Sequence, residues 1–377
     1  MTSFERHYTR DDRAESVYQY LVVEVPAGAP AITVRLDYDR ADAVVDLGLI
    51  GPDRFGGWSG GERSVVTITP TWATPGYVPG EVAGGWQVIL GLYRVGPAGV
   101  TVYVEVDTSA VVEPEPAPLP PRPERPPRRD LPARPGCEWL AVDFHSHTVH
   151  SDGGLEIAEL AVLAASRGLD VLAVTDHNTV SHHAHLAAAG DHAGILLLPG
   201  QEVTTDSGHA NCFGALPWID FREPPDTWRA TADAHGGVMS VNHPWAGDCA
   251  WRLPLSGPAA LVEMWHSTWD LVHPTPLAEW RSFGTIPIGG SDFHRHEGGV
   301  IPGNPTTWIE CADRSVEGVL DALRNGRVAI SATPDAPVLL GDGDEYTAID
   351  DDGCQLVTPE AGGEALLADG RIVAFAP

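Results

Sequence analysis

The chain has 377 residues, which exceeds the length of one typical domain and predicts two. Its 52 acidic and 23 basic residues give a formal charge of −29 at pH 7, and so negative a surface repels nucleic-acid backbones and anionic lipid. We therefore expect neither polymeric nucleic acid nor a membrane as a partner. Bound divalent cations would still let a cleft accept a small anionic substrate.

The compartment is indicated by the cysteines and by the lack of long apolar stretches. The first 16 residues contain no apolar run, and no stretch is apolar for long enough to cross a bilayer. The cysteines are scattered, odd in number and never arranged as CxxC, which argues against a disulfide framework. The sequence thus predicts a cytoplasmic protein, and it leaves the oligomeric state open.

Residues 1–112 read as a series of short strands. Segments rich in Val, Ile, Thr and Tyr alternate with turns rich in Gly and Pro, a pattern typical of an antiparallel β-sandwich or jelly roll. No nucleophile clusters with a base here, so we interpret this part as an accessory domain. A glycan- or protein-binding module is one role that the pattern leaves open. The predicted strands are residues 17–25, 32–38, 44–50, 64–70, 86–93 and 99–106.

Residues 113–136 form a proline-rich segment. Proline removes backbone donors and favours extended polyproline II, so we interpret the segment as a semi-rigid spacer between two domains. A ligand for a proline-binding partner is the alternative.

Residues 137–377 change to alternating strands and helices, which indicates a parallel α/β architecture and favours a barrel. Such barrels carry their chemistry at the carboxyl ends of the strands. A tail from about residue 336 reads as short strands and turns. The predicted strands are residues 140–144, 170–176, 194–200, 238–243, 261–266 and 285–292, and the predicted helices are 157–168 and 315–326.

The motif DFHSHTVHSDG, residues 143–153, holds the first candidate metal ligands. His145 and His147 are two residues apart, so on a strand they project to the same side and supply half of a tetrahedral site. Asp152 follows in a turn and can reach back with a carboxylate oxygen. Taken alone, an HxH pair is more often an exposed polar strand end.

Two further motifs follow the next two predicted strands. In VTDHN, Asp176 and His177 close an apolar strand, where an acid often orients a neighbouring metal-binding histidine. An Asx turn or a helix cap is the alternative reading. In PGQEVTT, Glu202 lies in an apolar strand, where a carboxylate is costly unless it is paired or metal-bound. His209 follows shortly after.

Two more strand ends complete the pattern. His243 ends an apolar strand in VNHPW, and Asp292 and His294 are two residues apart in GGSDFH. Each motif is weak alone, but at least five strand ends deliver His, Asp or Glu toward one face. The sequence therefore predicts a metal-dependent hydrolase.

These motifs, in this order, resemble the PHP family, named for polymerase and histidinol phosphatase domains, and locally its CehA/McbA-type metallohydrolase branch. The resemblance covers residues 138 to about 330. It implies a distorted (β/α)7 barrel that binds two or three divalent metals. The implied ligands are His145, His147, Asp152, His177, Glu202, His209, His243, Asp292 and His294.

The resemblance also implies a division of these ligands. His145, His147, Glu202 and Asp292 would hold one ion; Asp152, His177 and His294 a second; and His209 and His243 a third, with Glu202 bridging. Nitrogen and oxygen ligands without thiolate suit Zn²⁺, Mn²⁺ or Fe²⁺ and disfavour Ca²⁺.

Other polar residues near the motifs are candidates for substrate contact. His266 ends the strand LVEMWH and is a candidate for leaving-group protonation, with plain packing as the alternative. Arg295 follows the DxH motif and can meet a phosphate oxygen, although a surface salt bridge is the commoner role. His150 falls between ligand positions. His182 and the histidines after it are expected at the surface, with His182 as a candidate to line the cleft.

The expected activity is hydrolysis of a small phosphate mono- or diester by a metal-bridging hydroxide. A carbamate or carboxylic ester hydrolase with the same metal centre is the alternative. A binding role of the N-terminal sandwich is a second alternative.

Overall fold

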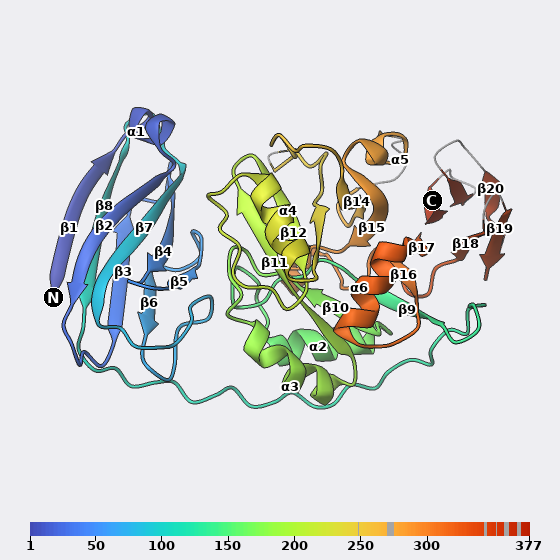
Figure 1. The fold of residues 1–377 in the computed structure, drawn as a ribbon, viewed down its shortest axis with the longest axis horizontal. Coiled ribbons are helices and arrows are strands. Elements are labelled where there is room, and N and C mark those ends of the chain that lie inside the picture. The colour runs from blue at the N-terminus through green and yellow to red at the C-terminus, as the bar shows by residue number, and fades with distance from the viewer. Residues whose placement is uncertain (248, 270–274, 343–344, 352, 358–361, 368–370) are drawn as a thin grey trace. The chain divides into compact units, whose positions relative to one another are not determined.

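The computed structural model describes residues 1–247, 249–269, 275–342, 345–351, 353–357, 362–367 and 371–377 (Figure 1). The chain divides into two compact units. The first comprises Met1–Pro118 with the short segments Val149–Asp152 and His177–His182, and the second comprises Leu119–Thr148, Gly153–Asp176 and His183–Pro377. No helix among the described residues is both long and apolar enough to cross a membrane.

The first unit contains two four-stranded antiparallel sheets. All six predicted strands are present, and alternate side chains of both sheets share one buried apolar cluster. One sheet has the order β1 (Thr2–Tyr8), β8 (Val100–Asp107), β3 (Ile32–Tyr38) and β6 (Val65–Ile68). The other has the order β2 (Tyr18–Val25), β7 (Gly84–Arg94), β4 (Val44–Ile50) and β5 (Phe55–Trp58), and α1 (Arg10–Glu15) follows β1.

Two segments from later in the chain also belong to the first unit. The guanidinium of Arg63 donates to the carbonyl of Ser151 at 2.8 Å. The hydroxyl of Thr179 donates to the carbonyl of Gly76 at 2.9 Å. Charge-assisted and buried bonds of this kind fix backbone position, so both segments are held by residues in the connections between the N-terminal strands.

The second unit is built on one twelve-stranded mixed sheet. Strands β9 to β11 run parallel, as do β13 to β15, and their short apolar sequences are buried on both faces, as parallel strands usually are. The sheet order begins β15 (Gly284–Gly290), β14 (Ala259–His266), β13 (Val238–Val241), β12 (Gly208–Phe213), β11 (Leu196–Thr205) and β10 (Val171–Val174). It continues with β9 (Glu138–Asp143), β16 (Thr306–Cys311), β17 (Val328–Ser331), β22 (Ile372–Ala376), β21 (Gly363–Leu366) and β20 (Gln355–Val357).

The expectation of a parallel architecture holds for β9 to β11 and for β13 to β15, but the sheet is mixed, because β12 and the strands from β16 onward pair antiparallel. β12 pairs antiparallel with both neighbours because only Asp206 and Ser207 separate it from β11, too few residues for a parallel crossover. β16 also runs antiparallel to β9. The sheet curves so that β15 comes against β16, where the Thr307 hydroxyl lies 2.7 Å from the Gly289 nitrogen and 3.0 Å from its carbonyl oxygen. This approach fits a distorted barrel.

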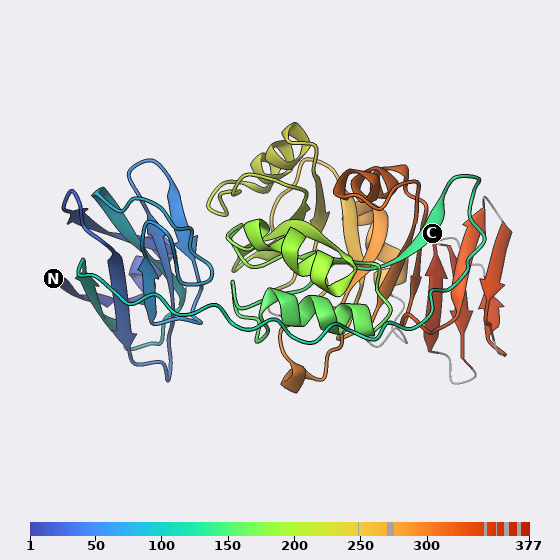
Figure 2. The same ribbon diagram turned by 90° about the horizontal axis from the view of Figure 1, so that it is seen from below.

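Helices cover the outside of this sheet. Figures 1 and 2 show α2 (Ile157–Ser166) and α3 (His183–Ala193) side by side, packed through Leu160, Ala164 and Leu186. The predicted helix near residue 315 is α6 (Val316–Asn325), and α4 is Pro225–Ala234. Short elements complete the unit: α5 (Thr275–Glu279), η1 (Trp280–Ser282), η2 (His296–Gly298), and the hairpin β18 (Val338–Asp342) and β19 (Glu345–Ile349).

The second half of the proline-rich segment packs on the second unit. In Figure 2 it runs as an extended segment without strand structure past α2. Arg125 donates to the carbonyl of Leu169 at 2.7 Å, and Arg128 donates to Asp170 at 2.8 Å. Arg129 and Arg134 make further contacts of the same kind. These contacts fix several points of the segment that its composition predicts to be a semi-rigid spacer.

Candidate metal centre

The first histidine pair lies just after β9. His145 and His147 are fully buried. The carboxylate of Asp143 accepts the backbone N–H groups of His145 at 3.1 Å, Ser291 at 2.9 Å and Gly303 at 2.8 Å. Burial raises the pKa of Asp143 against the opposing effect of these hydrogen bonds. One carboxyl group therefore ties the HxH motif to the loop that carries the DxH motif.

His145 directs one ring nitrogen at carboxylates of the cluster. Its Nδ1 lies 2.9 Å from Glu263 Oε1. Its Nε2 is buried without a hydrogen bond, although it lies 3.3 Å from Glu202 Oε1 and 3.2 Å from Asp292 Oδ1. A buried ring nitrogen that faces two carboxylates without a hydrogen bond is an arrangement that a divalent cation would satisfy.

Glu202, on β11, is the centre of the cluster. It is fully buried, and Asn242 Nδ2 donates to its Oε1 at 2.9 Å. Besides His145, its oxygens lie 3.5 Å from His147 Nε2, 3.2 Å from His209 Nδ1 and 3.4 Å from His243 Nε2. A carboxylate surrounded by several imidazoles can ligate one ion or bridge two.

Asp292 and His294 approach from the loop after β15. His147 Nε2 lies 2.9 Å from Asp292 Oδ1, and His266 Nε2 lies 3.2 Å from Asp292 Oδ2. The ring of His294 stacks on that of His147, with centroids 4.2 Å apart.

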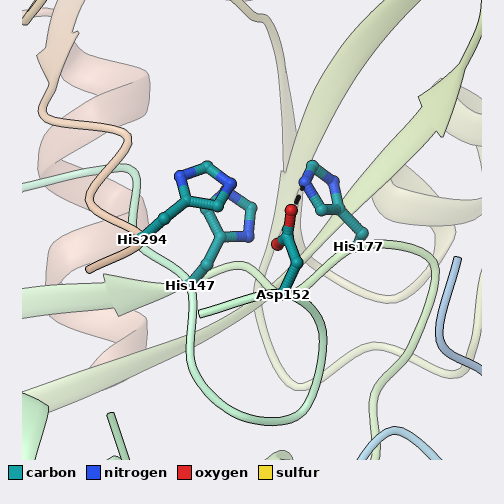
Figure 3. Close-up of side chains that lie close together, drawn as sticks. All are labelled: His147, Asp152, His177 and His294. Atoms are coloured by element: carbon teal, nitrogen blue, oxygen red, sulfur yellow. Dashed lines mark ion pairs between the residues drawn. The ribbon is translucent and has the colours of Figure 1, made fainter. Parts of the chain in front are cut away.

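Asp152 lies in the loop after β9, and His177 lies in the loop after β10. Figure 3 shows them facing each other, with His177 Nε2 3.6 Å from Asp152 Oδ1. His147 and His294 are drawn beside them, and the potential ligand atoms of all four side chains lie within 4.8 Å of one another.

All nine predicted ligands fall into groups whose ligand atoms lie within 4.8 Å of one another. The groups overlap, since His145, His147, His177 and Glu202 each occur in two of them, so they do not reproduce the expected division into three separate sets. The groups are His147–Asp152–His177–His294, His145–His243–Asp292, His145–His147–Glu202 and His177–Glu202–His209.

The imidazoles and carboxylates of the cluster shift one another's pKa values toward the charged forms. Burial alone would lower the pKa of His145, but the carboxylates of Asp292 and Glu202 raise it well above its usual value. Burial would raise the pKa of Asp292, but His145 and the hydrogen bond from His147 hold it well below its usual range. Protons thus neutralise the cluster in the absence of metal, and ions must displace them to bind.

Two carboxylates of the site were missed in the sequence. Asp143 and Glu263 both lie in buried strands, as Glu202 does. The argument that an acid in an apolar strand needs a partner applies to both residues. It could have been made for Glu263 in LVEMWH as clearly as for Glu202 in PGQEVTT. Asp176 accepts both the N–H and the hydroxyl of Thr148, at 2.8 and 2.7 Å, and its orienting role toward a histidine stays a prediction.

The remaining candidates differ in position. His266 is buried, its Nδ1 lies 2.8 Å from the Thr268 hydroxyl, and its Nε2 faces Asp292. Arg295 is exposed, and its role stays a prediction. His150 lies 2.7 Å from the hydroxyl of Ser181 within the first unit. His182 is fully buried, so the expectation of a surface position was wrong for it.

The backbone is unusual at the site. Among the described residues, His243 and Asp292 are two of only four non-glycine residues with positive φ, at 25° and 53°. A third, Asn178 at 54°, directly follows His177. Left-handed backbone is costly for residues with a Cβ, and such residues cluster at functional sites.

Comparison with known proteins gives short or distant matches. No family model matches the chain. It is 40% identical over 83 residues to a 3′,5′-nucleoside bisphosphate phosphatase of Chromobacterium violaceum, covering 22% of this chain and 29% of that protein. It is 38% identical over 64 residues to a 5′-3′ exoribonuclease of Haemophilus influenzae, covering 17% and 23%. The matches thus span less than a third of either relative.

The solved structures that match do so at low sequence identity and low TM-score. A two-domain protein of Bacteroides vulgatus, described as containing a predicted PHP-like metal-dependent phosphoesterase, has a TM-score of 0.44 at 20% identity, covering 67% of this chain and 91% of that one. An amidohydrolase of Chromobacterium violaceum, with bound sulfate and no metal, has a TM-score of 0.34 at 18% identity, covering 51% and 98%.

Proposed function

We propose that the chain is a metal-dependent phosphoesterase of the PHP family, in its CehA/McbA-like branch, that hydrolyses a small phosphate mono- or diester. The observation that carries the proposal is the buried cluster in which Glu202 lies within 3.5 Å of imidazole nitrogens and His145 Nε2 has no hydrogen bond. The short match to a bisphosphate phosphatase supports the choice of a phosphate ester.

The residues of the cluster suit Zn²⁺, Mn²⁺ or Fe²⁺, two or three per chain. When bound, such ions supply Lewis acidity and ionise a water near neutral pH. Glu202 and Asp292 contribute negative charge that holds the ions, and His145 and His243 contribute neutral nitrogens. Burial of Glu202, His145 and His243 excludes bulk water, which strengthens each electrostatic contact.

The proposal is tested by metal analysis and a substrate panel. We expect stoichiometric transition metal in the purified protein and hydrolysis of a phosphomonoester or phosphodiester. A chelator should abolish the hydrolysis, and added Mn²⁺, Zn²⁺ or Fe²⁺ should restore it. A protein that holds only trace metal after reconstitution, or that cleaves aryl carboxylic esters but no phosphate ester, contradicts the proposal.

His266 is proposed to protonate the leaving group. Because general acids contribute typically a hundredfold or more, His266→Gln should lower kcat by about 10²-fold while metal content stays at the parent level. Thr268→Val removes only the contact at Nδ1 and serves as the milder control, with a smaller loss expected. Parent-like turnover of His266→Gln would exclude the role, and loss of metal would make His266 a ligand instead.

A carbamate or carboxylic ester hydrolase is the second candidate. The ring of Trp269 lies 5.6 Å from that of His266, and Trp245 lies 5.4 Å from Trp269, so an aromatic wall stands beside the proposed acid. Such a wall suits an aryl leaving group. The chain has no lysine, which limits charged phosphate contacts to arginine. The same panel separates the two candidates.

We further propose that the N-terminal unit is a β-sandwich accessory domain. The division into this domain over residues 1–112, a linker over 113–136 and a catalytic domain over 137–377 stays a prediction, and Arg125 and Arg128 of the linker contact Leu169 and Asp170.

A further inference from the structure

Glu263 is a buried carboxylate that lies behind the proposed ligands rather than among them. It is on β14 and 2% exposed. Its Oε1 lies 2.9 Å from His145 Nδ1, and its Oε2 accepts the backbone N–H of His243 at 2.8 Å. One side chain therefore contacts two predicted ligands, which follow the different strands β9 and β13.

The contact with His145 selects a tautomer. A carboxylate accepts hydrogen bonds, so His145 Nδ1 carries a proton when it donates to Glu263. In the neutral ring the lone pair is then on Nε2, the atom that faces Glu202 and Asp292 without a hydrogen bond. Carboxylates that bind the far nitrogen of a metal-ligating histidine fix its tautomer and orientation in this way.

The contact between Glu263 and the N–H of His243 stabilises an unfavourable backbone conformation at His243. The φ of His243 is 25°, outside the regions that residues with a Cβ prefer. A charged acceptor for its N–H stabilises that conformation and hence the place of its ring, which stacks on His145 with an interplanar angle of 15°.

The neighbouring strand leaves space for this arrangement. A Cβ at Gly290 would lie 2.4 Å from Glu263 Oε1 and 2.6 Å from His145 Cβ. Both distances are too short for packed atoms, so only glycine permits the pair at this point of β15. The position of the Glu263 side chain is therefore restricted both by the lack of a side chain at Gly290 and by its own hydrogen bonds.

We propose that Glu263 is a positioning residue that fixes the tautomer of His145 and the backbone of His243 together, and so joins two ligand groups of the metal centre. The inference rests on the metal centre of the proposed function, but not on the substrate.

Glu263→Gln tests it, because glutamine keeps the shape but must turn an NH₂ toward one of the two donors. We expect a folded variant whose affinity for Zn²⁺, measured by competition with a chelator, is about 10- to 100-fold lower. The absorption spectrum of the Co²⁺-loaded variant should also differ from the parent's. Parent-like affinity and spectrum would overturn the proposal.

Glu310→Gln is the matched control. Glu310 is likewise a carboxylate in a strand, 3% exposed, but it lies against Arg134 and Arg327. Its substitution should leave Zn²⁺ affinity and the Co²⁺ spectrum unchanged. An equal loss of affinity in both variants would mean that any buried charge matters, and would also overturn the proposal.

A second measurement needs no substitution of Glu263. In the Zn²⁺-loaded parent with ¹⁵N-labelled histidine, NMR should show His145 protonated at Nδ1, and protonation at Nε2 would overturn the proposal. Neither readout uses substrate. If Glu263→Gln binds metal weakly while the parent binds metal but cleaves no phosphate ester, the proposed phosphoesterase activity is rejected and the role of Glu263 is not. If the parent binds no metal, both the proposed function and the role of Glu263 are rejected.

Discussion

Glu202→Gln is expected to lose bound metal and at least about three orders of magnitude in hydrolysis rate. The substitution keeps the side chain's size but removes the charge that faces His145, His147, His209 and His243. Loss of one metal-centred contribution costs several kcal/mol of transition-state stabilisation, or about a thousandfold in rate.

Metal content and kcat/KM of Glu202→Gln, measured on the ester that the panel identifies, check this expectation. Circular dichroism should show the parent's fold, since no apolar volume is lost. Glu310→Gln again serves as the control, because it removes a buried charge whose partners are arginines. A fully metallated and active Glu202→Gln would remove the carboxylate from the centre and with it the main support for the proposed function.

Asp143→Ala is expected to lower the free energy of unfolding by several kcal/mol. The substitution leaves the buried N–H groups of His145, Ser291 and Gly303 without their acceptor. Each unsatisfied buried group costs about 1–3 kcal/mol, and the total stability of a domain is about 5–15 kcal/mol. Much of the variant should therefore be unfolded or aggregated at physiological temperature.

Urea unfolding of metal-free protein measures this effect without a contribution from bound ions. Asp143→Asn is the control, since its amide oxygen can still accept from His145 and Ser291, and it should lose less stability than the alanine variant. Equal stability of Asp143→Ala and the parent would show that water replaces the carboxylate, and that the two motifs are joined by other contacts.

The strands and most candidate ligands could be predicted because both follow from local patterns. Apolar β-branched segments formed strands where expected, and their polar ends, at His145, Glu202 and Asp292, lie together because parallel strands end at one edge. The hairpin at β12 was missed, since its tight turn reverses a direction that strand–helix alternation predicts to be parallel.

Contacts between distant residues were the part that the sequence did not reveal. Glu263 contacts His145 across 118 positions, and Arg128 contacts Asp170 across 42. No spacing rule links such pairs, because the pairing depends on how strands and an extended segment pack. Composition correctly indicated an extended proline-rich segment, but composition does not specify the surface on which it lies.

The positive φ angles of His243 and Asp292 set stability against the proposed metal binding at the same residues. Each such conformation costs about 1–3 kcal/mol, which glycine would recover but a ligand side chain cannot. Selection of this chain for heat resistance alone would thus favour glycine at both positions first. The most robust descendants from such a selection would keep the fold and lose the metal, whereas selection that retains function must improve stability elsewhere.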